Sequence, residues 1–279
     1  MLKLYTARNS ICTQKVFITL DEKSLAFDTE QVNLFTNEQY DPEYLKLNPK
    51  GVVPTLLHDG HAIVESTLIC EYLDETYPQT ALVPDDPYLR TQMRLWSKLI
   101  DEKIFEATRE ISFSAHFRQI MRKMTEEQRE GRYRNVGDPE RRDRMMSGYT
   151  KGVESHYVYQ GVADFEKAFK SMEAALGPLG AGGLGGPWLL GEAFSLGDIN
   201  MIPYVARMAF LNLADIWIAD RPRVQAWWER AQARPSYKAS ISDQLTEEDA
   251  GEMWKYGSEI RDRVAELRAD YLDAIHSSG

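Results

Sequence analysis

The chain has 279 residues, of which 43% are hydrophobic, and its formal net charge is −10 at pH 7. This length and apolar content can bury a large core in one large domain or in two smaller ones. The acidic balance argues against a nucleic-acid partner, because phosphate binding depends on clustered Lys and Arg.

The sequence shows no membrane, export or disulfide signal. No apolar run approaches the roughly 20 residues that a bilayer-spanning helix needs, and the N-terminus lacks a basic region followed by an apolar one. Only two cysteines are present, Cys12 and Cys70, so no disulfide framework is implied. The five histidines follow no metal-ligand spacing. We therefore expect a cytoplasmic protein without a membrane segment or a bound metal.

The first eighty or so residues predict a compact α/β unit. Their elements follow the order β-α-β-α-β-β-α. The predicted elements are a strand at 2–6, a helix at 11–23, a strand at 27–34, a helix at 41–47, a hairpin of two strands around Asp59-Gly60, and a helix at 66–77.

A bend at Val53-Pro54 opens the first strand of that hairpin. Proline cannot donate a ladder hydrogen bond, so Pro54 belongs at the start of the strand. A cis bond there is one way to turn the neighbouring carbonyl and amide outward. The backbone of Val53 would then be free to pair with something other than protein.

Ser10 follows the first strand and precedes the first helix. A strand, a turn and a helix start place this hydroxyl beside free backbone N–H groups and the positive end of the helix dipole.

After Pro78 the composition changes. Residues 81–87 are rich in proline and acid and predict a linker. Beyond the linker we expect helices only, over 88–117, 152–176, 196–211, 223–234 and 246–275, the last range being one helix or a pair. The sequence thus predicts one domain at 1–80 and an all-helical domain at 88–279, the latter with a C-terminal extension at 246–275.

Two segments of the helical domain are less regular. The Arg-rich segment 118–150 predicts a helix, a break and another helix, and its charges form either a solvated face or a cover that attracts acidic substrates. The glycine-rich segment 177–186 lacks a phosphate-loop pattern, so it predicts a flexible loop. Ser195 and Asp198 have capping-box spacing ahead of an apolar helix, and we expect a structural role for both.

In combination, these motifs resemble the glutathione transferases. The order of Ser10, Asn48-Pro49 to Val53-Pro54, Glu65-Ser66 and Ser195 to Asp198 is similar to theirs over nearly the whole chain. The resemblance implies a thioredoxin-like N-terminal domain, an all-helical C-terminal domain, glutathione as the thiol substrate, and a homodimer. The segments 69–73 and 93–98 further resemble bacterial members related to β-aryl-ether-cleaving enzymes.

The resemblance also assigns roles to residues. Val53 would bind the extended peptide as a strand adds to a sheet, next to Pro54. Glu65 and Ser66 would hold the γ-glutamyl group at a helix start, and Lys50 the glycyl carboxylate. Without the family order, Glu65-Ser66 would be read as an ordinary helix cap.

Ser10 is the predicted catalytic residue. The thiolate is the nucleophile, and a hydroxyl that donates a hydrogen bond to it favours the charged form. The neighbours Asn9, Cys12 and Thr13 are alternatives in a different register. Cys12 also defines a rival function, a thiol transferase or disulfide reductase that forms a mixed disulfide, although the serine-type register turns Cys12 toward the core. Cys70 is expected in the core.

The second substrate is expected to be a small, apolar or aromatic electrophile. Conjugation, as in detoxification, and ether cleavage, as in aromatic catabolism, use the same activated thiolate. A non-catalytic glutathione-binding protein is a further alternative, because the apolar Val52 replaces an often polar position. Candidates for the pocket wall, which by helical spacing can equally be core residues, are Ile104, Phe105, Thr108, Phe113 and His116.

Overall fold

The structure is a computed structural model that describes residues 1–7, 9–180 and 182–277. Arg8 of the predicted turn and Ala181 of the predicted glycine-rich loop lie outside the described residues. The chain divides into two compact units. Unit 1 comprises Met1–Ser97, Leu176–Pro203 and Ala226–Thr246, and unit 2 comprises Lys98–Ala175, Tyr204–Gln225 and Glu247–Gly279. This division differs from the predicted domains because two later segments belong to unit 1.

Unit 1 contains a four-stranded sheet with the order β2-β1-β3-β4. The strands are β1 (Leu2–Thr6), β2 (Asp28–Gln31), β3 (Thr55–His58) and β4 (His61–Val64). β1 runs parallel to β2 and antiparallel to β3, which pairs with β4 as a hairpin. β2 is shorter than predicted and is exposed along its whole length, as suits a strand at the edge of a sheet.

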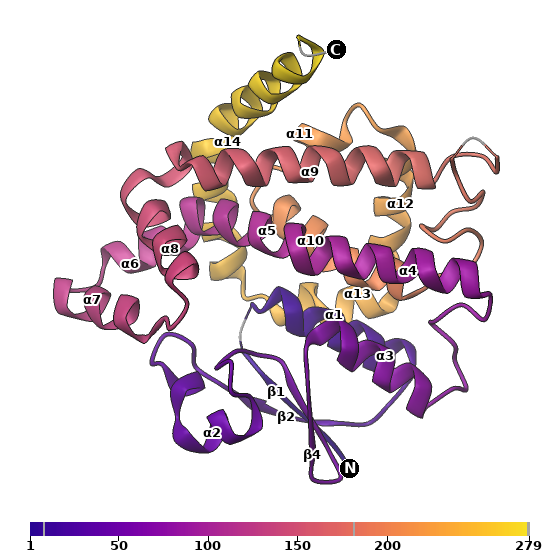
Figure 1. Ribbon diagram of the computed structural model, residues 1–279, viewed down its shortest axis with the longest axis horizontal. Helices are drawn as coiled ribbons and strands as arrows, with labels where there is room; N and C mark the ends of the chain where they lie inside the picture. The colour runs from indigo at the N-terminus through magenta and orange to yellow at the C-terminus, as the bar shows by residue number, and fades with distance from the viewer. Residues whose placement is uncertain (8, 181, 278–279) are drawn as a thin grey trace. The chain divides into compact units, whose positions relative to one another are not determined.

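Three helices complete this part of unit 1: α1 (Ile11–Glu22), α2 (Pro42–Leu47) and α3 (Ser66–Thr76). A short 3-10 turn, η1 (Glu38–Tyr40), precedes α2. α1 and α3 lie side by side, and α2 lies apart from that pair (Figure 1). The predicted order β-α-β-α-β-β-α is therefore confirmed.

The linker after α3 is fastened to the α/β part by Asp74. Its buried carboxylate accepts hydrogen bonds from the main-chain N–H groups of Leu82 and Val83, at 2.8 and 3.1 Å. The same carboxylate pairs with the Lys23 ammonium at 2.6 Å, and both side chains are more than nine-tenths buried. Because the buried ammonium and carboxylate are paired, neither charge is left uncompensated in the interior. The contact therefore holds the linker in place.

Several helices beyond the linker differ from the prediction, among them the short α11 (Asp215–Ile218), which no predicted range contains. The predicted long helix at 88–117 consists of α4 (Pro87–Leu99) and α5 (Phe105–Ser112) with two π-helical segments, η2 (Ile100–Ile104) and η3 (Phe113–Phe117). Pro235 lies directly after the predicted helix at 223–234. It does follow α12 (Pro222–Gln232), but it also occupies the first turn of α13 (Pro235–Ser240), where a missing N–H has no cost.

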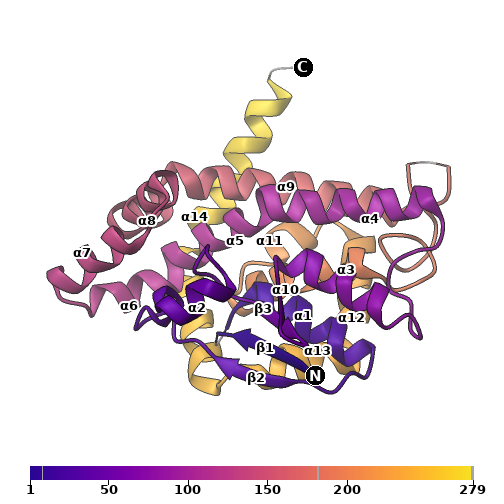
Figure 2. The ribbon, with the colours of Figure 1, turned by 60° about the horizontal axis from the view of Figure 1, so that its bottom comes forward.

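Unit 2 contains the other helices. They are α6 (Arg118–Arg122), α7 (Glu126–Asn135), α8 (Pro139–Lys151), α9 (His156–Ala175), α11 (Asp215–Ile218) and α14 (Glu247–His276), whereas α10 (Leu196–Phe210) contributes to both units. Short 3-10 turns are η4 (Gly152–Glu154) and η5 (Ser242–Gln244), the latter in unit 1. α6, α7 and α8 gather at one end of α9 (Figure 2).

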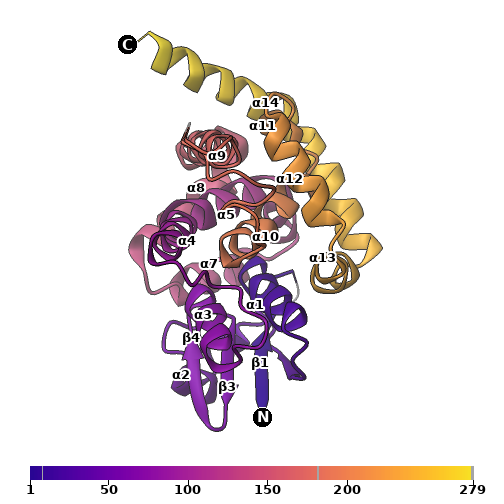
Figure 3. The ribbon, with the colours of Figure 1, turned by 90° about the vertical axis from the view of Figure 1, so that its right-hand side faces the viewer.

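Large aromatic side chains fill the core of unit 2. Phe165 and Phe169 of α9 pack on Trp217 of α11, with ring centroids 5.3 and 6.0 Å apart, and all three are almost fully buried. α14 passes along α9, and its last turns project beyond it (Figure 3). Within the described parts of the chain, no helix is both long and apolar enough to cross a bilayer.

Candidate functional site

The sheet register of unit 1 brings three predicted site segments to one end of the sheet. Tyr5 of β1 pairs with Thr55 of β3, and Thr55 pairs with Val64 of β4. At this end of the sheet, the chain therefore leaves β1 toward Ser10, enters β3 from Val53-Pro54 and leaves β4 into Glu65-Ser66. Segments that are more than 40 residues apart in sequence thus lie near one another in space.

Ser10 caps the N-terminus of α1. Its hydroxyl oxygen accepts the N–H of Thr13 at 3.3 Å, and its own N–H donates to the carbonyl of Ala7 at 3.1 Å. The side chain is half-buried. Because the oxygen acts as acceptor inside the cap, the hydroxyl proton remains available to a bound anion at the positive end of the helix.

The neighbours of Ser10 differ in accessibility. Thr13 is buried, and its hydroxyl has no hydrogen-bond partner among the described residues, so it points into the interior. Asn9 has a left-handed backbone, with φ at 62°. Cys12 is half-buried, so it is less enclosed than the core position expected for it, whereas Cys70 is fully buried as expected.

The turn before β3 carries the main chain of Val53. The Val53-Pro54 peptide is cis. The neighbouring Val52 carbonyl accepts hydrogen bonds from Tyr44 Oη at 2.6 Å and Asn48 Nδ2 at 2.9 Å. Among the described residues, neither the N–H nor the carbonyl of Val53 has a partner. An unpaired donor and acceptor on one residue at a strand end can accept an extended peptide.

The side chain of Val53 is buried in a small apolar cluster with Ala7, Val32 and Tyr44. Ala7 follows β1 and precedes Ser10 by three residues. The cluster therefore holds the turn that carries Val53 against the segment that carries Ser10.

Tyr44, which holds the Val52 carbonyl together with Asn48, was not singled out from the sequence, and Asn48 was named only as part of the Asn48-Pro49 motif. Their signal was their four-residue spacing, which places both on one side of the end of α2. Burial raises the pKa of Tyr44, so its hydroxyl stays protonated and able to donate.

Glu65 and Ser66 open α3. Glu65 has a left-handed φ of 68°, which is uncommon for a residue with a side chain, and its carbonyl accepts the N–H of Ile69 at 2.8 Å. Ser66 is 8% exposed and occupies the first position of the helix. The side chain of Glu65, the N-cap residue, makes no capping hydrogen bond within the described part of the chain. The start of α3 can therefore accept an external carboxylate.

Lys50 and Glu65 bind each other, although the resemblance assigned them to different ends of glutathione. The Lys50 ammonium donates to Glu65 at 2.7 Å, and both side chains are exposed, at 70% and 44%. An exposed ion pair of this kind contributes about 0–1 kcal/mol and exchanges partners readily.

Ser195 and Asp198 form a buried cap in unit 1. The Asp198 carboxylate accepts the N–H groups of Leu189 and Ser195 at 2.9 and 3.1 Å, the Ser195 hydroxyl at 3.1 Å, and the Trp227 indole N–H at 2.9 Å. Burial raises the pKa of Asp198 to about 6. At neutral pH the carboxylate therefore remains charged and joins the loop before α10 to α12.

The predicted pocket residues lie on η2, α5 and η3 of unit 2. Ile104 and Thr108 are fully enclosed, and the Thr108 hydroxyl donates to the Ile104 carbonyl at 2.7 Å. Both therefore belong to the packed interior of the unit. Phe105 and Phe113 are half-buried and remain candidates for a pocket wall.

His116 is buried between η3 and α14. Its Nδ1 lies 3.9 Å from the Glu252 carboxylate and has no hydrogen-bond partner among the described residues. Burial lowers the pKa of His116, an effect that Glu252 only partly offsets. The imidazole is therefore mainly neutral at pH 7.

Arginines of the segment 118–150 bind groups within unit 2. Arg118 donates to the carbonyls of Tyr149 and Thr150 at 2.8 and 3.0 Å, and Arg142 donates to the carbonyl of Val136 at 2.8 Å. These contacts tie α6 and α7 to α8, so these two side chains have a structural role.

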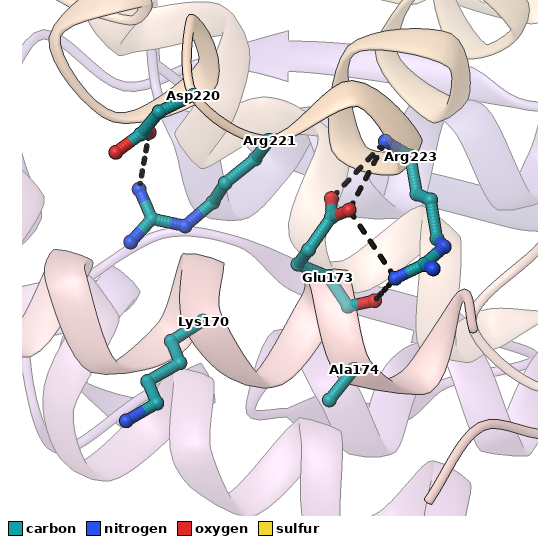
Figure 4. A pocket seen from close by; sticks show the side chains of 6 residues that line it. All are labelled: Lys170, Glu173, Ala174, Asp220, Arg221 and Arg223. Carbon is teal, nitrogen blue, oxygen red and sulfur yellow. Dashed lines mark hydrogen bonds and ion pairs between the residues drawn. The ribbon is translucent and has the colours of Figure 1, made fainter. Parts of the chain in front are cut away.

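A hollow of about 340 Å³ on unit 2 is lined by six residues, four of which bind one another in the pairs Glu173–Arg223 and Asp220–Arg221 (Figure 4). The Glu173 carboxylate accepts the N–H groups of Arg223 and Val224 at 3.1 and 3.0 Å and thereby caps α12. Arg221 pairs with Asp220 at 3.1 Å. The hollow is thus a helix-capping cluster. Within the described residues, no group of three His, Cys, Asp or Glu side chains is arranged to hold a metal ion.

Comparison with known families agrees with this architecture. Residues 4–81 match the glutathione S-transferase N-terminal domain, and residues 117–230 match the glutathione S-transferase C-terminal domain. The chain is 30% identical over 255 residues to the protein LigF of Sphingobium sp., covering 85% of this chain and 91% of that protein. The chain belongs to the glutathione S-transferase superfamily. Its fold is accordingly a thioredoxin-like sheet domain followed by a helical domain, as predicted.

Other relatives show how varied this superfamily is. The chain is 29% identical over 241 residues to a maleylacetoacetate isomerase of Pseudomonas aeruginosa, covering 85% of this chain and 94% of the isomerase. The crystal structure of the β-etherase LigF superposes with a TM-score of 0.74 at 28% identity and covers 87% of this chain and 99% of that structure. Members of the superfamily are glutathione-dependent enzymes of various activities, with glutathione as co-substrate.

Proposed function

We propose that this glutathione S-transferase activates the thiol of glutathione with Ser10 for attack on a small apolar or aromatic electrophile. The observation that carries the proposal is the unpaired main chain of Val53. It lies at the same end of the sheet as Ser10 and Glu65-Ser66. The cysteinyl unit of glutathione would add to this edge as a short strand. Its sulfur would then lie toward the start of α1.

The ends of the peptide would be recognised by the three polar residues nearest that edge. The first turn of α3 and the Ser66 hydroxyl suit the γ-glutamyl carboxylate. Glu65 would take the γ-glutamyl amino group, and Lys50 the glycyl carboxylate. Since Lys50 and Glu65 are paired at 2.7 Å, glutathione would replace one exposed ion pair by two.

Ser10 would stabilise the thiolate. A free thiol has a pKa near 8.5, so it is mostly protonated at neutral pH. Donation of the Ser10 proton to the sulfur, beside the N-terminus of α1, would lower that pKa. Ser10 would therefore activate the nucleophile without forming a covalent bond itself.

For the electrophile, we propose conjugation or β-aryl ether cleavage, the latter because a relative is named a β-etherase. In ether cleavage the sulfur would form a bond to the carbon that bears the aryloxy group, and the aryloxide would leave as the bond from that carbon to oxygen breaks. The half-buried Phe105 and Phe113 of unit 2 remain the proposed residues for the aryl group, whereas His116 is too enclosed to contact it.

The proposal is tested by retention on immobilised glutathione together with turnover of a generic aryl halide. Retention with turnover that is lost in Ser10→Ala supports it. Retention without turnover would make the protein a glutathione-binding protein, and absence of retention would refute the proposal.

A second candidate is thiol transfer by Cys12. It is favoured by one observation, a half-buried cysteine in the first turn of α1. There the thiol would be activated by the helix N-terminus and form a mixed disulfide with glutathione. Disulfide reduction that is lost in Cys12→Ala and retained in Ser10→Ala would support this candidate over the first.

We also propose that the protein is a cytoplasmic homodimer, in which an exposed apolar surface of unit 1 forms the interface. Leu68 of α3 and Leu95 of α4 are 56% and 53% exposed. Between them, Arg94 and Glu71 join the two helices by an ion pair at 2.8 Å. A second copy of the chain would cover this surface.

A further inference from the structure

A buried hydrogen-bond network holds the turn that carries Val53. Tyr44 Oη and Asn48 Nδ2 approach the Val52 carbonyl at 2.6 and 2.9 Å. The same two atoms approach the Thr55 hydroxyl at 3.0 and 3.1 Å. Tyr44 is 7% exposed, Asn48 1% and Thr55 0%, so water does not compete for these bonds.

The proton count allows one arrangement of this network. The Tyr44 hydroxyl has a single proton, which goes to the Val52 carbonyl, its nearer partner. Asn48 donates one amide proton to Val52 and the other to Thr55. The Thr55 hydroxyl must then donate to Tyr44 Oη. Each of the four protons is donated once, and a fully satisfied network of this kind is rigid.

This network fixes the direction of the Val53 N–H. The Val52 carbonyl and the Val53 N–H belong to the same peptide unit, which is planar. Because Tyr44 and Asn48 occupy the carbonyl from two directions, they also set the plane and with it the direction of the N–H. Tyr44 additionally packs in the same apolar cluster as the Val53 side chain.

We propose that Tyr44 and Asn48 are positioning residues for glutathione, which aim the Val53 N–H at the cysteinyl carbonyl of the bound peptide. This inference rests on the proposed function. Both residues act through the Val52-Val53 peptide and touch no substrate. They should therefore affect the affinity for glutathione and leave the thiol chemistry unchanged.

Tyr44→Phe tests the proposal because it removes one oxygen and keeps the ring, whose centroid lies 5.7 Å from that of Tyr5. Loss of a hydrogen bond of this kind should raise the Kd for glutathione about three- to thirty-fold. Titration calorimetry measures this change. We expect the KM for glutathione to rise in parallel. The kcat with an aryl halide and the KM for that halide should stay as in the wild type.

Tyr5→Phe is the matched control. It removes a phenolic oxygen from a ring packed against the same cluster, and that oxygen takes no part in the network. Its Kd for glutathione should equal that of the wild type. An equal rise in Tyr5→Phe and Tyr44→Phe would mean that any change in this cluster weakens binding, and would overturn the proposal.

Thr55 provides an independent second test. Thr55→Val removes the hydroxyl that joins Tyr44 and Asn48, whereas Thr55→Ser retains it. We expect the Kd for glutathione to rise in the first variant and to stay near the wild-type value in the second. In the double variant with Tyr44→Phe, the loss of binding free energy should be smaller than the sum of the losses in Thr55→Val and Tyr44→Phe, because both substitutions break one network.

The outcomes separate the inference from the proposed function. A wild type that does not bind glutathione refutes both. A wild type that binds it, with Tyr44→Phe binding equally tightly at a lowered Tm, refutes the inference alone, since the network would then have only a structural role. If Tyr44→Phe does not fold, equal Kd values for Thr55→Val and Thr55→Ser refute it.

Discussion

An ion pair between α1 and α13 holds the helix that carries Ser10. The Glu22 carboxylate accepts hydrogen bonds from Nε and Nη2 of the Arg234 guanidinium, at 2.8 and 2.6 Å, together with one from the Ser236 hydroxyl. Burial alone would raise the pKa of Glu22, but these hydrogen bonds outweigh it and hold the pKa below its ordinary value. Glu22→Gln keeps the shape of the side chain and removes its charge.

The expected loss in the free energy of unfolding is about 2 kcal/mol. Hydrogen bonds to charged groups contribute about 1.5–3 kcal/mol each. In the variant, the neutral side-chain oxygen still accepts a weaker hydrogen bond, so part of this contribution remains. The Glu22 and Arg234 side chains are 13% and 28% exposed, so solvent screens the pair only partly. Urea unfolding at pH 7 measures the difference.

Glu43→Gln is the matched control, because the Glu43 pair with Lys46 is 79% and 68% exposed. Exposed pairs contribute about 0–1 kcal/mol, so this variant should unfold almost as the wild type does. Equal losses in the two variants would refute the reasoning.

The effect of Glu22 should also depend on pH. Because its pKa is lowered in the folded protein, the stabilisation is present above the ordinary value of 4.5 and is lost as the pH falls through the folded-state pKa. The difference between the wild type and Glu22→Gln should therefore vanish in acid. A difference that persists unchanged at low pH would show that packing, and not charge, is the cause.

Three further predictions concern other parts of the chain. Leu95→Glu should convert a dimer to a monomer in light scattering, and an unchanged mass would contradict the proposed interface. Lys50→Met should weaken glutathione binding about three- to tenfold in calorimetry, less so at high salt, and an unchanged Kd would exclude its proposed role. Gly152 has a φ of 59°, and an added Cβ would lie 2.2 Å from the Arg118 guanidinium. Gly152→Ala should therefore destabilise by about 1–3 kcal/mol in urea, unlike Gly131→Ala at an open helical position; equal values would contradict this.

Local sequence patterns predicted the α/β part well. Hydrophobic alternation and the proline and glycine positions placed the strands and helices of the first eighty residues in the observed order. The hairpin around Asp59-Gly60 and the start of α3 at Ser66 are both present. These features depend on residues close in sequence, so the sequence alone carries the information.

Features that depend on contacts distant in sequence were less accessible. The π-helical segments at 100–104 and 113–117 interrupt a run whose apolar spacing fits an ordinary helix. Lys50 and Glu65 pair across 15 residues, and no local pattern distinguishes that partner from a ligand. Thr108 has the same spacing as a pocket residue, but its burial is visible only in the packed structure.

The pKa of the bound glutathione thiol tests the central claim most directly. The ultraviolet absorbance of the thiolate, followed against pH, should give a value well below the roughly 8.5 of a free thiol for the wild type and for Cys12→Ala. For Ser10→Ala, with glutathione still bound, we predict a value close to that of the free thiol. An unchanged pKa in Ser10→Ala would contradict the assignment of Ser10 as the residue that stabilises the thiolate.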